Sequence, residues 1–124
     1  MKAIKKILIA EDELLIAKVL RLQLEKNGFT VDQVADGNAV YEKVVEMKPD
    51  LIIMDVFLKN RSSGLDAARK LRNGKIIIPI IFTTGNSFEI TNKETAGISN
   101  SFVLTKPVEL FQITRLISDL QVLY

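Results

Sequence analysis

The stretch that decides the fold runs from Leu51 to Leu58 and reads LIIMDVFL. It places four apolar residues before a single aspartate, Asp55, and then turns apolar again. A continuous apolar run is typical of a strand that helices cover on both faces of a parallel sheet. Asp55 therefore falls at the carboxyl end of a buried strand. A carboxylate at that place is either buried at an energetic cost or held at the edge of a site.

Apolar runs of the same kind recur along the chain and alternate with longer segments whose apolar residues follow helical spacing. Strands that alternate with helices pair in parallel through crossover connections. The sequence therefore predicts an α/β fold in which a five-stranded parallel sheet is doubly wound by five helices. No linker or repeat interrupts the pattern, so residues 1–124 are expected to form a single domain. The expected strands cover residues 4–10, 29–35, 50–55, 78–84 and 101–105, and the expected helices cover residues 13–28, 37–49, 63–74, 87–97 and 107–124.

The composition restricts the classes of function. The chain has no cysteine and no histidine, which excludes disulfides, thiolate metal sites and an imidazole base or ligand. Its net charge of +2 is too small to argue for nucleic-acid binding. No segment approaches a membrane span, and the apolar run after the first lysines is too short for a signal peptide. We expect a cytoplasmic domain that contacts neither nucleic acid nor membrane.

Charged and hydroxyl side chains gather at the carboxyl ends of four of the predicted strands. In an open α/β sheet, binding sites lie just beyond these ends. The side chains are therefore expected to meet at one edge of the sheet. They are Glu11, Asp12 and Glu13 after the first strand, Asp55 at the third, Thr83 and Thr84 at the fourth, and Lys106 and Pro107 after the fifth.

The acids of this set predict a metal site. Glu11, Asp12 and Asp55 would repel one another at close range unless a cation neutralised them. Oxygen ligands without imidazole or thiolate select a hard cation, so Mg²⁺ is the expected ion. Mg²⁺ bound by two carboxylates keeps water ligands, and a phosphoryl oxygen can replace one of them. A neighbouring lysine, Lys106, and a threonine hydroxyl from Thr83 or Thr84 suit the other phosphoryl oxygens.

Taken in this order, the strand-end motifs resemble those of the receiver domain of bacterial and archaeal two-component response regulators. The resemblance covers the whole chain and implies a flavodoxin-like receiver architecture with strand order 2-1-3-4-5. It implies that Asp55 accepts a phosphoryl group from the phosphohistidine of a sensor histidine kinase or phosphotransfer protein. The chain would then switch a protein–protein contact surface, and it would catalyse nothing beyond its own phosphorylation and dephosphorylation.

The same resemblance names the metal ligands. Asp12 and Asp55 would bind Mg²⁺ directly, and Glu11 would act mainly through water. The main-chain carbonyl of Phe57 would complete the protein ligands. We also expect the side chain of Phe57 to shield a phosphoryl group on Asp55 from water, because it stands two residues after the acceptor.

The resemblance also implies a switch, and the sequence departs from the family here. Thr83 would be the switch hydroxyl, and Lys106 would pair with the acceptor and then with the phosphate, next to a cis bond to Pro107. Receivers carry an aromatic residue three positions before this lysine, where this chain has Val103, with Phe102 one position earlier. The interval from Thr83 to Lys106 is also one residue longer than usual. Either a bulge in the fifth strand restores Phe102 to the switch position, or the domain switches without an aromatic residue.

The loop after the acceptor departs from the family as well. Leu58 stands where many receivers have a proline, and Gly64 comes one residue late. We expect this longer, basic loop to be solvated on the surface.

Each residue taken alone also suits an ordinary structural role, such as helix capping by acids or strand formation by threonines. Their convergence on one edge favours a site. A magnesium phosphatase would need a second acid where Phe57 stands, and nucleotide binding would need a glycine-rich loop after the first strand. The alternative that stays open is a degenerate receiver, which binds partners without being phosphorylated.

The sequence names neither the kinase nor the downstream protein partner. The last predicted helix is apolar on more than one face, which is compatible with a homodimer through this region. Phe29, Phe82 and Phe111 are expected in the core. The apolar residues of the last helix are Leu110, Phe111, Ile113, Leu116, Ile117 and Leu120.

Overall fold

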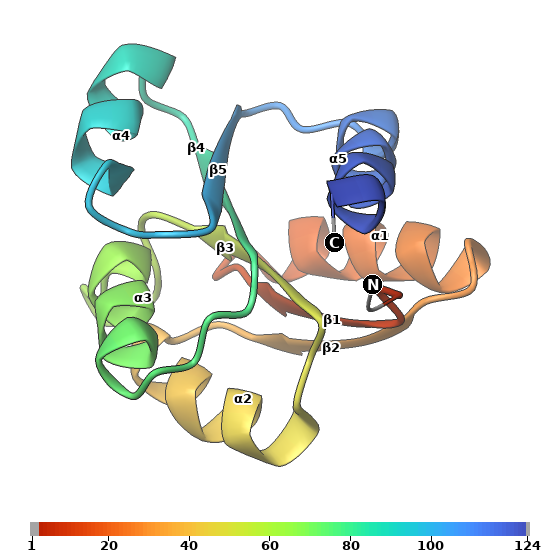
Figure 1. Cartoon of the computed structure of the whole chain (residues 1–124), viewed down its shortest axis with the longest axis horizontal. Coiled ribbons are helices and arrows are strands. Elements are labelled where there is room, and N and C mark those ends of the chain that lie inside the picture. Colours follow the sequence, from red (N-terminus) through yellow and green to blue (C-terminus); the bar gives the residue numbers. More distant parts are fainter. Residues whose placement is uncertain (1–2, 124) are drawn as a thin grey trace.

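Five parallel strands form one sheet at the centre of the fold (Figure 1). The computed structural model describes residues 3–123, without the side chains of residues 88–90 and 123. The strands are β1 (Lys6–Ala10), β2 (Thr30–Val34), β3 (Leu51–Asp55), β4 (Ile80–Thr84) and β5 (Ser101–Thr105). Their order across the sheet is β2-β1-β3-β4-β5, which confirms the predicted fold class and strand order.

Helices cover both faces of this sheet, and each segment predicted to be helical contains one. The helices are α1 (Leu14–Lys26), α2 (Val40–Met47) with the short 3₁₀ helix η1 (Gly37–Ala39) before it, α3 (Gly64–Asn73), α4 (Phe88–Thr95) and α5 (Leu110–Leu123). α1 and α5 lie on one side of the sheet, and α2, α3 and α4 lie on the other (Figure 1). Among residues 3–123, no helix has the length and apolar character needed to cross a membrane.

The strands contribute side chains to two apolar cores, one on each face of the sheet, because successive side chains point in opposite directions. Ile9 and Ile53 pack with α1 and α5, whereas Ile52 and Phe82 pack with α2 and α3. All five residues of β3 are buried, as its continuous apolar sequence predicts. Asp55 ends this strand, so the burial of β3 fixes where its carboxylate lies.

α1 has a second apolar face that the domain itself leaves uncovered. Ala17 and Leu24 are buried against the sheet. Leu15, Val19 and Leu22 are exposed, and Leu15 keeps 75% of its surface in contact with solvent. Spacings of four and three residues place these three side chains on the same side of the helix. They form the outer face of α1.

α5 differs from its prediction in two ways. It begins at Leu110 rather than at Pro107, because the chain is still irregular through the two residues after the proline. Phe111 was predicted to be in the core, but 63% of its surface is exposed because the helix turns Ile113 towards the sheet instead. Phe29 is partly buried and packs against the core on the α1–α5 side.

Two glycines end helices for different reasons. Gly28 follows α1 with a φ of 92°, a conformation that glycine adopts without strain. Gly74 follows α3 with a φ of −81°, and Lys75 takes the left-handed conformation instead. Gly74 is close to a neighbouring side chain, because a Cβ atom there would lie 2.7 Å from the hydroxyl oxygen of Tyr41, which would have to shift.

Arg72 near the end of α3 links the segment just before β4 to the segment just before β5. Its guanidinium group makes five hydrogen bonds, all to main-chain carbonyl oxygens. The planar fork of an arginine can reach several acceptors at once, whereas a lysine presents a single ammonium group. The acceptors are Ile76 at 2.7 Å, Ile78 at 2.8 Å, Ser99 at 2.9 and 3.1 Å, and Asn100 at 3.4 Å.

Replacing Arg72 by lysine should destabilise the fold by about 2–3 kcal/mol, because most of these charge-assisted hydrogen bonds would be lost. The matched control is Arg69→Lys on the same helix, since Arg69 is exposed and bonds only to Asp66 at 3.1 Å among the described contacts. That change should alter the free energy of unfolding by no more than about 0.5 kcal/mol. Urea denaturation measures both. Equal effects of the two substitutions would contradict this role of Arg72.

Candidate functional site

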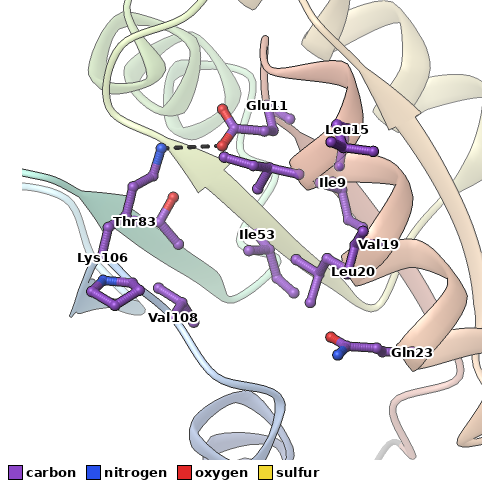
Figure 2. A pocket seen from close by; sticks show the side chains of 14 residues that line it. Ile9, Glu11, Leu15, Val19, Leu20, Gln23, Ile53, Thr83, Lys106 and Val108 are labelled. Carbon is purple, nitrogen blue, oxygen red and sulfur yellow. Dashed lines mark hydrogen bonds and ion pairs between the residues drawn. The ribbon is translucent and has the colours of Figure 1, made fainter.

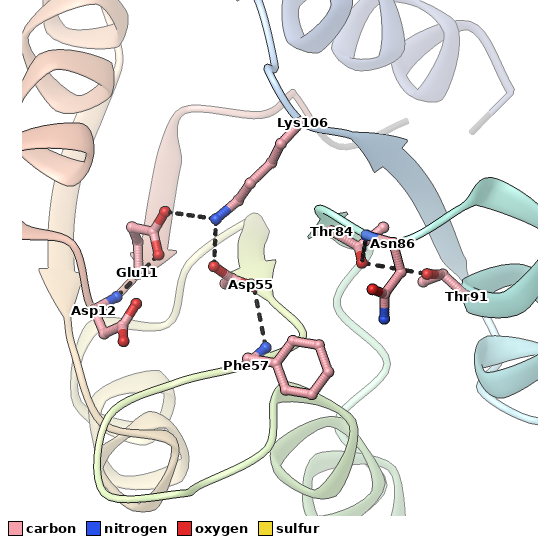
Figure 3. Close-up of polar contacts among 8 residues, drawn as sticks. All are labelled: Glu11, Asp12, Asp55, Phe57, Thr84, Asn86, Thr91 and Lys106. Carbon is pink, nitrogen blue, oxygen red and sulfur yellow. Dashed lines mark hydrogen bonds and ion pairs between the residues drawn. The ribbon is translucent and has the colours of Figure 1, made fainter.

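Three carboxylates meet at the carboxyl edge of the sheet, as the sequence predicts (Figure 3). β1 and β3 are neighbours with Ala10 paired to Met54, so the residues after Ala10 arrive beside Asp55. Glu11, Asp12 and Asp55 each bring an oxygen atom into a group whose members lie within 4.8 Å of one another. Glu11 and Asp55 are buried, each with 6% of its surface exposed, whereas Asp12 is exposed.

Lys106 supplies a positive charge to this group. Its Nζ donates to Glu11 Oε1 at 3.1 Å and to Asp55 Oδ2 at 2.5 Å. Its main-chain N–H donates to the carbonyl of Thr84 at 2.7 Å, which holds the chain after β5 against the tip of β4. The bond from Lys106 to Pro107 is cis, as predicted. One ammonium group therefore joins carboxylates that follow two different strands.

Burial and charge set the protonation of these groups. The pKa of Glu11 rises from 4.5 to about 7, chiefly through burial and then through Asp55, against the opposing effect of Lys106. Burial acts to lower the pKa of Lys106, but its hydrogen bonds to Asp55 and Glu11 outweigh this effect and raise it. Lys106 is therefore charged at neutral pH, while Glu11 titrates close to neutral pH.

The donor set fits the predicted Mg²⁺, since it offers three carboxylates and neither nitrogen nor sulfur ligands. Asp55 Oδ1 accepts from the N–H of Phe57 at 3.0 Å, and Glu11 Oε2 accepts from the N–H of Asp12 at 3.0 Å. A divalent cation would favour the ionised form of Glu11, which burial and Asp55 disfavour. The direct roles of Asp12 and Asp55, the water-mediated role of Glu11 and the carbonyl ligand from Phe57 stay predictions.

The two threonines at the tip of β4 face opposite sides of the sheet. Thr83, whose Cα is paired with that of Asp55, lines a cavity of about 620 Å³ together with Glu11 and Lys106 (Figure 2). The hydroxyl of Thr84 is hydrogen-bonded to α4 instead. The interval from Thr84 to Lys106 is one residue shorter than the interval from Thr83 and so has the length usual for receivers. Thr84 is therefore a second candidate for the switch hydroxyl. The length of this interval was the signal in the sequence that could have identified it.

The cavity lies between α1 and the loop after β5 and is mostly apolar. Side chains from the sheet, α1 and the loop form its walls (Figure 2). Leu15 and Val19, which belong to the outer face of α1, also line it. The cavity thus connects that outer face with the carboxylate group. The remaining apolar lining residues include Ile9, Leu20, Ile53 and Val108.

β5 pairs with β4 residue by residue along its whole length, so the bulge that would have moved Phe102 does not form. Phe102 packs against the core on the α1–α5 side, whereas Val103 packs against the core on the opposite side. Val103 therefore keeps the position three residues before Lys106. Of the two alternatives, this register favours a switch that does not use an aromatic side chain.

The loop of residues 56–63 is exposed at Lys59, Asn60 and Arg61, as predicted for a solvated surface loop, and it is also hydrogen-bonded to the segment after β2. The side-chain amide of Asn60 donates to Asp36 Oδ2 at 2.7 Å. The N–H of Gly37 donates to Ser62 Oγ at 2.8 Å. Hydrogen bonds from the N–H of Asn38 and from Asn60 hold the pKa of Asp36 below its ordinary value. These contacts join residues about 25 positions apart, and sequence spacing does not reveal them.

This loop fixes the residues that follow the acceptor. Leu58, which stands where many receivers have a proline, is buried and anchors the loop. The side chain of Phe57 lies beside Asp55 and keeps 62% of its surface exposed (Figure 3). The ring of Phe57 is therefore open to solvent near the carboxylate group, and its shielding of a phosphoryl group on Asp55 stays a prediction.

Comparison with known proteins identifies the family of this chain. A family model described as the response regulator receiver domain matches residues 7–118. The chain is 33% identical over 103 residues to the alkaline phosphatase synthesis transcriptional regulatory protein PhoP of Bacillus subtilis, covering 83% of this chain and 42% of that protein. It is 34% identical over 110 residues to the response regulator protein PmrA of Pseudomonas aeruginosa, covering 87% of this chain and 48% of that protein. The chain belongs to the family of response regulator receiver domains.

Solved receiver structures share the fold. The receiver domain of the Francisella response regulator 1452 superposes with a TM-score of 0.84 at 24% identity, over 94% of this chain and 95% of that one. The chemotaxis response regulator CheY4 of Vibrio cholerae superposes with a TM-score of 0.82 at 22% identity, over 93% and 99%. The chain spans less than half the length of PhoP and PmrA, so the similarity covers only a part of each of them.

Glu11 should make the stability of the metal-free protein depend on pH. Because its pKa is 4.5 unfolded and about 7 folded, the native state binds more protons between these values. Its contribution to stability is present in full below pH 4.5 and is lost as the pH rises through 7. The free energy of unfolding of the wild type, minus that of Glu11→Gln, should therefore fall across this window.

Urea denaturation in EDTA at a series of pH values measures this difference. Added Mg²⁺ should stabilise the wild type more at neutral pH than in acid, because it binds the ionised carboxylates. A difference that stays constant from acid to neutral pH would show that Glu11 is not perturbed in the folded protein.

Proposed function

We propose that this chain is a phosphoacceptor switch whose acceptor is Asp55. The observation that carries the proposal is the placement of the Lys106 ammonium 2.5 Å from Asp55 Oδ2 and 3.1 Å from Glu11 Oε1, inside a group of three carboxylates. Such an arrangement gives a buried nucleophilic carboxylate and a fixed cation beside it. Membership of the receiver family supports the same role.

In the proposed reaction, an oxygen of Asp55 attacks the phosphorus of a phosphohistidine on a partner kinase or phosphotransfer protein. A P–O bond forms, the P–N bond breaks, and the histidine leaves as imidazole. The chain itself contains no histidine, which fits a recipient. Lys106 offsets the negative charge as the two anions approach, and the N–H of Phe57 holds Asp55 Oδ1 in place.

Mg²⁺ bound by Asp12 and Asp55, with Glu11 acting through water, would offset the remaining charge on the phosphoryl group. Thr83 and Thr84 both stand at the neighbouring strand tip and can donate a hydroxyl hydrogen to a phosphoryl oxygen. A donor that reaches Asp55 lies over the cavity and the outer face of α1, where apolar side chains are exposed.

We assign the chain no enzymatic role beyond its own phosphorylation and dephosphorylation. Its location in the cytoplasm, the downstream partner and a homodimer stay predictions.

Acetyl phosphate with Mg²⁺ should add one phosphoryl group to the wild type, and intact-mass spectrometry detects it. Asp55→Asn should take up none, because it lacks the nucleophilic carboxylate. Asp66→Asn, an exposed change on α3, is the matched control and should label like the wild type. EDTA should abolish labelling. Equal labelling of Asp55→Asn would refute this acceptor.

The alternative to this function is a degenerate receiver that binds partners while unmodified. It is favoured by Val103 in the position where receivers carry an aromatic residue. The wild type would then gain no phosphoryl group either from acetyl phosphate or from a phosphorylated kinase. The same mass measurement with both donors separates the two functions.

Phe57→Asn should shorten the lifetime of the phosphorylated protein several-fold, because the exposed ring at the rim of the site would no longer exclude water. Phe57→Leu is the matched control, since it keeps an apolar side chain and should retain most of the lifetime. The decay of phosphorylated protein after removal of acetyl phosphate gives the rate. An unchanged or slower decay in Phe57→Asn would rule out shielding by this ring.

A further inference from the structure

The segment that follows the acceptor folds back on itself as a short hairpin over residues 57–63. Phe57 and Ser63 face one another in an antiparallel bridge. A Cβ atom on Gly64, the next residue, would collide with the main-chain carbonyl oxygen of Asp55. The hairpin therefore begins and ends directly against the main chain of the acceptor.

The tip of the hairpin is a tight turn with a strained backbone. The N–H of Ser62 donates to the carbonyl of Lys59 at 3.2 Å, and the two residues between them, Asn60 and Arg61, have φ values of 60° and 55°. Positive φ at both central positions is the mark of a type I′ β-turn, which suits a two-residue hairpin. Asparagine tolerates this conformation, whereas a bulky residue such as arginine is strained in it. A strained turn persists only where surrounding contacts hold it.

Contacts with the segment between β2 and η1 hold this turn. The N–H of Lys59 donates to the carbonyl of Ala35 at 3.1 Å, and the side-chain amide of Asn60 donates to Asp36 Oδ2 at 2.7 Å. The other oxygen of this carboxylate, Asp36 Oδ1, accepts from the N–H of Asn38 at 2.9 Å and is thereby fixed at the start of η1. Asn60 thus connects the tip of the hairpin to a side chain that is itself held in place.

The hairpin carries the main-chain groups of the metal site. The N–H of Phe57 donates to Asp55 Oδ1 at 3.0 Å, which orients the carboxylate of the acceptor. The carbonyl of Phe57 is the predicted main-chain ligand of Mg²⁺. The ring of Phe57 is mostly exposed, so the hairpin, rather than burial of the side chain, holds this main chain in place. Because Mg²⁺ demands nearly ideal octahedral geometry, its affinity depends on how firmly its ligands are held before it binds.

We propose that Asn60 is a positioning residue for the metal site. Through Asp36 it holds the hairpin, and with it the main chain of Phe57, in the arrangement that binds a divalent cation. By linkage, the bound cation stabilises the hairpin in return. The proposal rests on the proposed function, because it concerns the ion that this function requires. It gives the start of η1, which carries none of the predicted ligands, an influence on how tightly the ion is bound.

Isothermal titration calorimetry of the unmodified protein with Mg²⁺ tests the proposal. Asn60→Gly removes the side-chain amide, and glycine adopts the positive φ of this position without strain. It should weaken Mg²⁺ binding by about tenfold, as changes to residues that support metal ligands do. Asn100→Gly is the matched control. Asn100 also has a positive φ, of 52°, and its amide donates to the carbonyl of Ile77 at 3.0 Å, but it precedes β5 at the opposite edge of the sheet. Asn100→Gly should bind Mg²⁺ like the wild type.

Exchanging the two side chains separates positioning from a general loss of stability. Asn60→Asp places a second carboxylate against Asp36 and should weaken Mg²⁺ binding at least as much as Asn60→Gly. Asp36→Asn combined with Asn60→Asp restores the hydrogen bond with donor and acceptor exchanged, and asparagine still caps η1. The affinity of this double variant for Mg²⁺ should recover towards that of the wild type.

Hydrogen–deuterium exchange in EDTA reports on the hairpin itself. Peptides covering residues 57–63 should exchange faster in Asn60→Gly than in the wild type. Peptides from β1 and β3 should exchange at the wild-type rate, which shows that the variant is folded. Wild-type affinity for Mg²⁺ in Asn60→Gly, equal weakening in Asn100→Gly, or no recovery in the double variant would overturn the proposal.

Intact mass after treatment with acetyl phosphate separates this proposal from the proposed function. If the wild type binds Mg²⁺ but gains no phosphoryl group from acetyl phosphate or a phosphorylated kinase, the proposed function fails, and weaker Mg²⁺ binding by Asn60→Gly still supports the positioning role. If the wild type gains the phosphoryl group and Asn60→Gly binds Mg²⁺ equally well, only the positioning role fails. A wild type that binds no Mg²⁺ overturns the positioning role.

Discussion

The contact of Lys106 with Glu11 and Asp55 is the interaction on which the rest of the site depends. Two buried carboxylates at neighbouring strand ends repel one another and lose hydration, and removing a charge partner from such a group leaves an uncompensated buried charge. One ammonium group offsets this repulsion. It also ties the chain after β5 to the chain after β1 and β3, so the edge of the sheet is assembled before any ion or phosphoryl group arrives.

Thr83 and Thr84 show how one strand tip serves both faces of the sheet. Successive residues of a strand point in opposite directions, so Thr83 lies with the cavity beside Lys106 while Thr84 contacts α4. The cavity that Glu11 and Lys106 also line is on the α1 side of the sheet. On the other side, the hydroxyl of Thr91 on α4 donates to Thr84 Oγ1.

The fold and the members of the site follow from local sequence patterns. Continuous apolar runs predicted the strands. The carboxylates and the lysine were predicted from the residues after Ala10, from Asp55 itself and from the residue after Thr105, because parallel strands end at one edge. Other features depend on contacts between distant segments. The spacing within α5 does not say which of its apolar sides meets the sheet, so Phe111 was misplaced. The fastening of Asn60 to Asp36 and the orientation of Phe102 likewise require the assembled structure.

The outer face of α1, formed by Leu15, Val19 and Leu22, has a consequence for handling the protein. A contiguous apolar surface on a small domain promotes self-association when nothing covers it. The solubility of the isolated chain should therefore fall with rising concentration and with salts that strengthen apolar association. Co-expression with a binding partner that covers this face would keep the chain in solution. The feature that leaves α1 open to other molecules is thus also what limits the concentration at which the chain stays dispersed.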